Sequence, residues 1–183
     1  LNKLKLPKRE DALINIHSPT DTNKLERAQK RLKFEELFFL QFHLLKMKLT
    51  RIKKHKGFIF EKVDNYFNNY FKNHLQFELT NAQKKVLKEI RADVKRGAQM
   101  NRLLQGDVGS GKTLVALLSM LMAVDNNFQS CMMAPTEILA HQHFKNISHE
   151  LKELDLKVAI LTGSTKTKER KGLHQQLENG EID

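Results

Sequence analysis

The segment from Gly106 to Thr113 constrains the fold of this chain more than any other feature of its sequence. It carries glycine at its first, fourth and sixth positions and ends in Lys112 and Thr113, which is the spacing G-x-x-x-x-G-K-[ST]. A short apolar run precedes the segment and a longer one follows it. We therefore predict a strand, a glycine loop and a helix in that order.

The residue types of this loop suit the binding of nucleotide phosphates. Glycines allow the backbone to curl so that successive N–H groups converge on phosphate oxygens, and the N-terminus of the following helix adds partial positive charge. Lys112 would reach the β and γ phosphates, and the Thr113 hydroxyl would coordinate Mg²⁺. The predicted phosphate-binding residues are Gly106, Asp107, Val108, Gly109, Ser110, Gly111, Lys112 and Thr113.

From about Leu79 onward, helical and short apolar segments alternate, which is typical of a parallel α/β sheet. Thr80 and Gln83 have the spacing of a capping box at the start of a helix that ends before Gly97. The predicted strands are 102–105, 130–134 and 157–161. The predicted later helices are 114–124, 137–154 and one that ends at about 178.

Residues 1–77 differ in character, because only Gly57 interrupts a helical pattern. Ser18 and Pro19 resemble the cap and first residue of a helix. The helix that follows, 25–49, carries an apolar face so wide that we expect it to be buried against another domain or a second helix. A further amphipathic helix is predicted from the spacing of Val63, Phe67, Tyr70, Phe71 and Leu75.

The charge of the chain is uneven, with 17 of the 32 Lys and Arg residues but only 8 of the 21 Asp and Glu residues in 1–77. The densest basic cluster contains Lys46, Lys48, Arg51, Lys53, Lys54 and Lys56. Such a cluster can bind a phosphate backbone with release of counterions, or it can simply be a solvated helix end. Charge alone leaves both interpretations open.

The composition fits a globular protein, with 40% hydrophobic and 29% charged residues. No apolar run approaches the roughly 20 residues that span a bilayer, so no membrane partner is expected. The single cysteine, Cys131, excludes an internal disulfide and favours a reducing, cytoplasmic location.

Three segments resemble the RecG family of superfamily 2 DNA helicases. They are the loop with its preceding residue, 105–113, the run Met133-Ala134-Pro135-Thr136-Glu137-Ile138-Leu139-Ala140-His141-Gln142-His143, and the upstream run Phe77-Glu78-Leu79-Thr80-Asn81-Ala82-Gln83. Further back, 28–37 resembles the helical connection that precedes the motor in that family. Transcription-repair coupling factors share the Gly-Asp-Val-Gly loop, but they usually have a bulky residue at the position of Ser110 and Pro-Thr-Thr at that of 135–137.

The resemblance implies an organisation for the whole chain. Residues 1–77 would be a helical linker, and residues 78–183 the first part of a RecA-like P-loop NTPase lobe with a truncated parallel sheet. The acidic Walker B motif, the second lobe and the DNA-splitting wedge domain would lie outside this sequence. The isolated chain is then expected to lack ATPase activity. We also expect it to self-associate through an unpaired sheet edge.

The resemblance also implies roles for residues outside the phosphate loop. Gln83 corresponds to a glutamine that reads the adenine edge, although its local pattern equally fits a helix-capping side chain. Pro135, Thr136 and Glu137 correspond to a helix start that contacts the DNA backbone, while an ordinary helix start explains the same residues locally. A second backbone-contacting loop would include Thr162 and Gly163.

The implied function is that of an ATP-dependent DNA helicase or translocase that remodels branched DNA, such as stalled forks and Holliday junctions, in recombination and repair. ATP and Mg²⁺ would be its cofactors. Two alternatives stay open from the sequence, a transcription-repair coupling translocase and a nucleotide-dependent switch with no DNA substrate.

Overall fold

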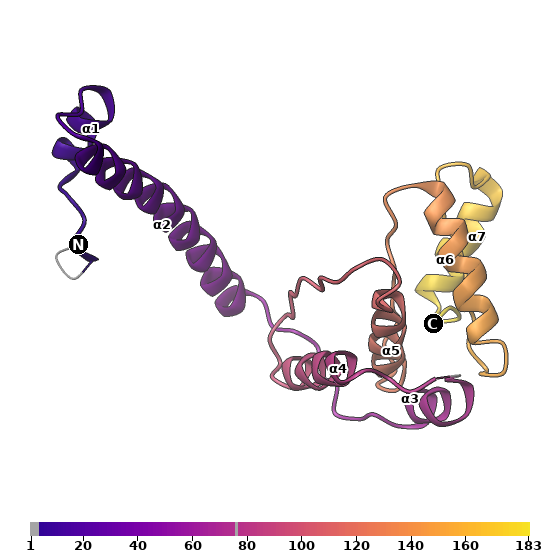
Figure 1. The fold of residues 1–183 in the computed structure, drawn as a ribbon. Coiled ribbons are helices and arrows are strands. Elements are labelled where there is room, and N and C mark those ends of the chain that lie inside the picture. Colours follow the sequence, from indigo (N-terminus) through magenta and orange to yellow (C-terminus); the bar gives the residue numbers. More distant parts are fainter. Residues whose placement is uncertain (1–3, 76) are drawn as a thin grey trace. The chain divides into compact units, whose positions relative to one another are not determined.

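Seven α-helices and one π-helical turn form in residues 4–75 and 77–183, which are the residues that the computed structural model describes (Figure 1). The chain divides into two compact units, Leu1–Lys56 and Gly57–Asp183. This division lies upstream of the boundary at 77/78 that the sequence predicts between a linker and a motor lobe. The predicted boundary concerns the family's domains, and it stays a prediction.

The first unit contains helices α1 (Arg9–His17) and α2 (Thr22–Lys54). Asp21 caps α2, because its side chain accepts a hydrogen bond from the backbone N–H of Lys24 at 2.7 Å. The prediction that Ser18 caps this helix is therefore wrong, and Ser18 instead follows the last residue of α1. Asp21 has the extended backbone that an N-cap residue needs, so it caps α2 in place of Ser18.

Helix α1 packs against the first turns of α2. Ala12 and Ala28 are almost fully buried at this contact, and their small side chains allow the two helices to approach closely. Beside them, the buried Arg31 forms an ion pair with Glu35 at 2.7 Å, and Arg9 lies 3.3 Å from the same carboxylate. The pairing gives the buried guanidinium the counter-charge that it needs away from water.

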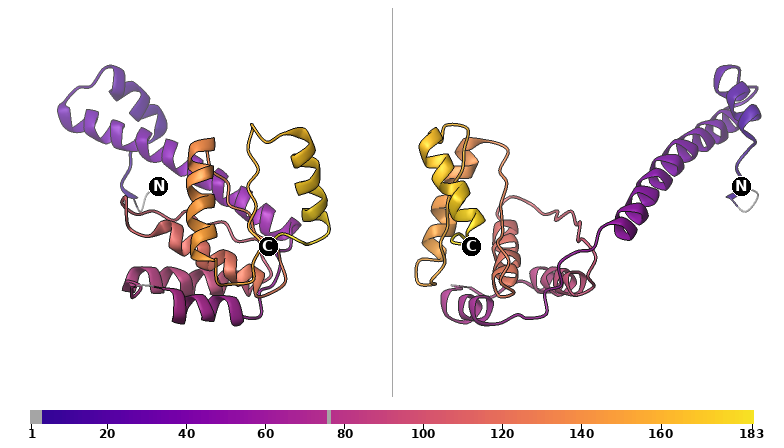
Figure 2. Two further views of the ribbon diagram at one scale, coloured as in Figure 1. Left: turned by 90° about the vertical axis from the view of Figure 1, so that its right-hand side faces the viewer. Right: turned by 180° about the vertical axis from the view of Figure 1, so that it is seen from behind.

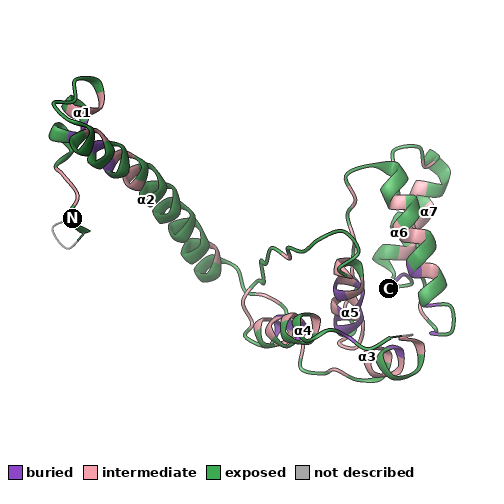
Figure 3. Ribbon diagram, viewed as in Figure 1, coloured by how far each residue is buried: buried purple, intermediate pink, exposed green. Residues whose placement is uncertain are grey.

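Beyond this contact, the apolar side chains of α2 are exposed (Figure 3). They include Leu37, Phe38, Phe39, Leu40, Phe42, Leu44, Leu45, Met47 and Leu49. The sequence predicts a covered apolar face, but within the described residues of this unit α1 covers only its N-terminal end.

The second unit begins with aromatic contacts and a short helical segment. Phe60 stacks against Phe128 at a centroid distance of 5.4 Å, and Phe58 packs against the same ring at 4.7 Å in a tilted arrangement. Helix α3 (Asn65–Asn69) then continues directly into the π-helical turn η2 (Tyr70–His74). The predicted amphipathic helix is thus shorter than expected, and Val63 precedes it rather than belonging to it.

Helices α4 (Asn81–Val94) and α5 (Lys112–Val124) build the core of this unit together with η2. Helix α5 is apolar on nearly every side, so it lies at the centre of the core (Figure 3). Its buried residues Leu118 and Leu121 are among the largest fully buried side chains, together with Tyr70. Both helices were predicted, and Gly97 lies in the turn after α4 with φ of 66°.

Helices α6 (Glu137–Glu150) and α7 (Thr167–Glu178) follow, close to their predicted positions. Ile147 of α6 and Leu151, which directly follows this helix, are buried in the core. The hydroxyl of Tyr70 donates a hydrogen bond to the carboxylate of Glu150 at 2.7 Å, and burial together with this acceptor raises the pKa of Tyr70.

The predicted strands 102–105, 130–134 and 157–161 are not formed as a sheet, since the described residues contain extended coil at these positions and no strand (Figure 2). Ser130 donates its N–H to the carbonyl of Asp183 at 2.7 Å, and Asp183 donates its N–H to the carbonyl of Lys157 at 3.1 Å. Residue 183 therefore lies between the first residues of the segments 130–134 and 157–161. The two segments therefore do not pair with each other at their first residues.

An apolar cavity of about 440 Å³ lies beside these extended segments. Side chains of α5, α6 and α7 line it, together with those of 130–134 and 157–161. Leu103 and Met133 are about 90% exposed, so large apolar side chains of the predicted strands face solvent. None of the helices in the described part of the chain combines the length and apolarity needed to cross a bilayer.

Candidate functional site

The loop from Gly106 to Gly111 leads into α5, as predicted, and connects it to residues 102–105, where the predicted strand does not form. Gly109 and Gly111 have φ values of 80° and 79°, a left-handed conformation that glycine adopts without steric cost. Such residues within a turn orient successive N–H groups toward one side, which is typical of anion-binding loops. Residues 106–110 of the loop are exposed, and the side chain of Val108 is fully open to solvent.

Lys112 is the first residue of α5, and its side chain bends back over the loop. Its ammonium donates hydrogen bonds to the carbonyls of Gly106 and Asp107, both at 2.7 Å. Both partners are neutral acceptors rather than carboxylates. A phosphate would therefore compete for this ammonium without first displacing a charged partner.

Thr113 follows on the same first helical turn and is exposed. Its position beside Lys112 at a helix N-terminus suits a hydroxyl ligand for Mg²⁺, an ion that usually keeps several waters and takes few protein ligands. The described residues contain no group of three or more His, Cys, Asp or Glu side chains arranged to hold a metal by themselves. A single hydroxyl beside the loop fits a Mg²⁺ that takes most of its ligands from phosphates and water.

Gln83 connects the start of α4 to the phosphate loop. Its backbone N–H donates to the Thr80 hydroxyl at 3.2 Å, and its side-chain oxygen accepts from the Thr80 N–H at 2.8 Å, so the predicted capping box is confirmed. Its amide nitrogen also donates to the carbonyl of Ser110 at 3.0 Å. A Cβ on Gly111 would clash with this amide nitrogen, so the close approach depends on glycine.

The amide of Gln83 still has unused hydrogen-bonding capacity. A side-chain amide has two N–H donors and two oxygen lone pairs, and the bonds to Ser110 and Thr80 use one of each. Capping and recognition of a base edge are therefore compatible, although the sequence left them as alternatives.

Pro135, Thr136 and Glu137 form the exposed start of α6. The Thr136 hydroxyl caps the helix by accepting from the N–H of Leu139 at 3.4 Å. The first N–H groups of any helix lack partners within the helix, so this end presents donors to solvent. It has the features expected of a contact to an anionic backbone.

Thr162 and Gly163 lie in a tight turn between the extended segment 157–161 and α7. The N–H of Thr162 donates to the hydroxyl of Thr165 at 2.9 Å, and the N–H of Thr165 donates to the carbonyl of Thr162 at 3.3 Å. Arg170 of α7 donates to the same carbonyl at 2.6 Å. Thr162 is half-buried, and Gly163 is exposed at the surface of the turn.

The two predicted DNA-contacting segments are joined through Glu137. The hydroxyl of Ser164 donates a hydrogen bond to its carboxylate, and His141 lies 3.6 Å from the same oxygen. Hydrogen bonds from Ser164 and then Thr162 hold the pKa of Glu137 below its usual range, with a smaller contribution from His141. Between the described residues, no hydrogen bond joins this pair of segments to the phosphate loop.

Sequence reasoning did not single out Ser164, Thr165 or Arg170, although all three organise the turn around Thr162. The run Gly-Ser-Thr after an apolar segment was a local signal for a hydroxyl-stabilised turn. The contact of Arg170 carried no such signal.

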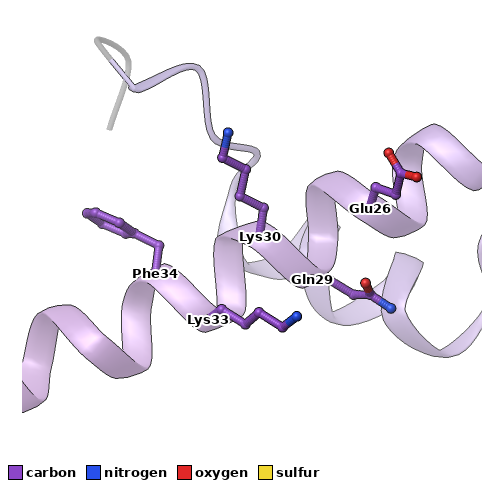
Figure 4. A pocket seen from close by; sticks show the side chains of 5 residues that line it. All are labelled: Glu26, Gln29, Lys30, Lys33 and Phe34. Atoms are coloured by element: carbon purple, nitrogen blue, oxygen red, sulfur yellow. The ribbon is translucent and has the colours of Figure 1, made fainter.

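A shallow hollow of about 470 Å³ lies on α2, and five residues of this helix line it (Figure 4): Glu26, Gln29, Lys30, Lys33 and Phe34. Their side chains diverge from the helix rather than converge on a common point. A binding site needs polar groups that converge, so we assign no role to this hollow.

Comparison with protein families matches residues 80–180 to the family described as DEAD/DEAH box helicase. The match covers more than half of the chain. It begins at the capping box of α4 and includes the phosphate loop and both of the predicted DNA-contacting segments.

Curated relatives resemble the chain over nearly its whole length. The ATP-dependent DNA helicase RecG of Synechocystis sp. is 40% identical over 94% of this chain and 21% of its own length. The ATP-dependent DNA helicase RecG of Thermotoga maritima is 43% identical over 100% of this chain and 23% of its own length. The chain thus spans roughly a quarter of the length of these relatives.

A solved structure gives the same result at the level of the fold. RecG bound to a three-way DNA junction matches with a TM-score of 0.86 and 42% identity, over 100% of this chain and 25% of that one. The comparison supports a P-loop helicase fold, although no sheet forms among the described residues. The chain therefore belongs to the DEAD/DEAH box helicase family, and along its whole length it is similar to a segment of RecG.

Proposed function

We propose that the natural protein is an ATP-dependent DNA helicase or translocase that remodels branched DNA, such as stalled replication forks and Holliday junctions, in recombination and repair. One observation carries this proposal: the whole chain matches a segment of RecG, with a TM-score of 0.86 to a RecG structure on a three-way junction. The geometry of the phosphate loop supports the ATP-dependent part of the proposal independently.

ATP and Mg²⁺ are the proposed cofactors, held by residues 106–113. The backbone N–H groups of the loop and the N-terminus of α5 would bind the phosphates. Lys112 would exchange its two carbonyl acceptors for phosphate oxygens, and the Thr113 hydroxyl would help to hold the metal. When bound, the metal would neutralise charge that develops on the transferred phosphoryl group.

Gln83 is proposed to read adenine while it supports the loop. Its remaining N–H and lone pair match the acceptor and donor on the adenine edge, as they do in glutamine–adenine pairs elsewhere. Its bond to the Ser110 carbonyl would keep the amide next to the bound nucleotide.

The start of α6 and the turn at Thr162 and Gly163 are proposed to contact the DNA backbone. Both present polar backbone at the surface, which suits phosphate contacts that position a protein without reading sequence. We further propose that the extended segments belong to a parallel sheet of the RecA-like type, and that the protein works in the cytoplasm, where ATP and chromosomal DNA meet.

The nucleotide site can be tested by measuring the affinity of the full-length natural protein for a fluorescent ATP analogue. We expect Lys112→Ala to weaken binding at least about tenfold, because it removes a charge-assisted contact worth roughly 1.5–3 kcal/mol. Lys145→Ala removes an exposed lysine of α6 and should leave the affinity unchanged. Equal affinities for Lys112→Ala and the unmodified protein would contradict the assignment.

The adenine role of Gln83 has its own test in the ratio of ATP to GTP affinity. Gln83→Glu retains a side-chain oxygen for the Thr80 N–H but loses the amide donor. If Gln83 reads adenine, the variant should lose most of the preference for ATP. If Gln83 only supports the loop, both affinities should fall by the same factor, and the proposed recognition would be wrong.

A further inference from the structure

The contact between Glu137 and Ser164 joins two segments that lie 27 residues apart in the chain. Glu137 is the first residue of α6, and Ser164 lies in the turn that precedes α7. Both segments follow extended stretches of the second unit, 130–134 and 157–161. The side-chain hydrogen bond therefore connects the segments that follow these two stretches at the surface.

The turn around Ser164 is itself held firmly on its other side. The Thr162 hydroxyl lies 3.0 Å from the Ser164 hydroxyl and 3.3 Å from that of Thr165, so the three hydroxyls form a connected group. Arg170 holds the carbonyl of Thr162 from α7. Only Glu137 connects this group to α6 among the hydrogen bonds of the described residues.

The charge of Glu137 argues against a direct contact with a phosphate. A carboxylate would repel a DNA backbone, whereas a carboxylate in the first turn of a helix interacts favourably with the helix dipole. Its oxygen is already engaged by Ser164 and lies near His141. The donors that face an anion here are backbone N–H groups, not this side chain.

We propose that Glu137 is a positioning residue: it fastens the turn 162–165 to the N-terminus of α6, so that both segments meet the DNA backbone as one rigid unit. The inference rests on the proposed function, because it assigns a role within the proposed DNA contact. It replaces the expectation that Glu137 itself touches DNA.

The role predicts a specific pattern of coupling between two substitutions. Glu137→Ala and Ser164→Ala each remove one partner of the same hydrogen bond, so their combined effect should not exceed the larger single effect. Ser164→Ala is the cleaner variant, because it removes the main hydrogen bond to Glu137 and leaves unchanged the charge that the DNA meets. Glu137→Gln retains an oxygen that accepts from Ser164 and should restore the connection.

The experiment measures the affinity of the full-length natural protein for a forked DNA at fixed salt, by fluorescence anisotropy. We expect Ser164→Ala and Glu137→Ala each to weaken binding by about five- to tenfold, which lies within the range of the net contribution of one hydrogen bond. The double variant should bind as weakly as the single variant with the lower affinity. The affinity of Glu137→Gln should stay within about twofold of that of the unmodified protein. Glu169→Ala is the matched control, because Glu169 also lies in the first turn of a helix, α7.

Several results would overturn the inference. Unchanged binding in Ser164→Ala, additive losses in the double variant, or tighter binding in Glu137→Ala would each show that Glu137 does not act through Ser164. If the unmodified protein binds no forked DNA, the proposed function itself fails. Hydrogen exchange tests the connection without DNA, since the amides of residues 162–165 should exchange faster in Glu137→Ala and keep their protection in Glu137→Gln.

Discussion

At the scale of single residues, the phosphate loop depends on close contacts that a short motif only partly encodes. The left-handed backbone at Gly109 and Gly111 follows directly from the glycine spacing. The contact between Gln83 and the Ser110 carbonyl does not, because it joins residues 27 positions apart. The motif thus predicts the loop, and the structure adds the side chain that supports it.

Two alanine substitutions separate backbone strain from crowding in this loop. Gly109→Ala and Gly111→Ala both force a side chain into left-handed backbone, at a cost of about 1 kcal/mol. Only a Cβ on Gly111 also meets the amide of Gln83, since nothing lies within 4 Å at Gly109. We expect Gly111→Ala to lower the thermal unfolding midpoint of the chain more than Gly109→Ala does. When Gln83→Ala is added to each variant, the difference between their unfolding midpoints should become smaller. Equal midpoints for the two single variants would contradict this explanation.

The pKa of Glu137 tests its contact with Ser164 by a different property. Hydrogen bonds to the carboxylate lower the folded-state pKa below the unfolded value of about 4.3. The contact therefore contributes stability above the unfolded pKa and loses it as pH falls through the lowered value. An NMR titration should give a midpoint for Glu137 below the ordinary range, and Ser164→Ala should raise it. No rise in that variant would exclude Ser164 as the main cause.

At the scale of elements, helices with local signals were predicted well and those stabilised by distant residues were not. The capping box of α4 and the apolar sequence of α5 are local, and both helices form where predicted. The segment after Gly57 differs, because α3 is capped by Asp125, a residue about 60 positions later. Its carboxylate accepts from the N–H groups of Asp64 at 2.8 Å and Tyr66 at 2.9 Å.

Strand pairing could not be predicted from local sequence patterns either, because it also depends on residues that are distant in the chain. Apolar composition predicts strands at 130–134 and 157–161, and none forms among the described residues, because pairing depends on which segment lies beside each of them. Here Asp183 bonds to the first residue of each segment, Ser130 and Lys157. Spacing along the sequence contains no information about this arrangement.

The cap on α3 is open to a direct test. We expect Asp125→Ala to destabilise the chain by about 1–2 kcal/mol, because it leaves helix-end N–H groups without an acceptor. Asp125→Asn keeps one side-chain oxygen and should cost clearly less. The measurement is the midpoint of urea unfolding for both variants. Equal losses would indicate that the charge of Asp125, rather than its acceptor geometry, stabilises this segment.

At the scale of the whole molecule, the chain combines the proposed phosphate-binding loop with many exposed apolar side chains. The exposed side chains include Phe38 and Phe42 on α2, and Leu103 and Met133 on the extended segments. Soluble monomers rarely expose so many large apolar groups in contiguous patches. The isolated chain should therefore associate with itself in solution.

Light scattering measures this association directly. We expect a mass well above the 21.3 kDa of one chain at micromolar concentration. Replacing Phe38 and Phe42 with serine should reduce the associated fraction if α2 contributes. If that variant still associates, the contact would lie at the extended segments, where the sequence predicts an unpaired sheet edge. A monomer for the unmodified chain at all concentrations would contradict the prediction.

The measurement that tests the central claim most directly is ATP hydrolysis by the full-length natural protein, on forked and on linear duplex DNA at the same salt concentration. The account predicts strong stimulation by the fork, weaker stimulation by linear duplex, and loss of both in Lys112→Ala. Equal stimulation by linear duplex would favour a translocase of the transcription-repair coupling type. Hydrolysis that does not respond to DNA, or that survives in Lys112→Ala, would contradict the account.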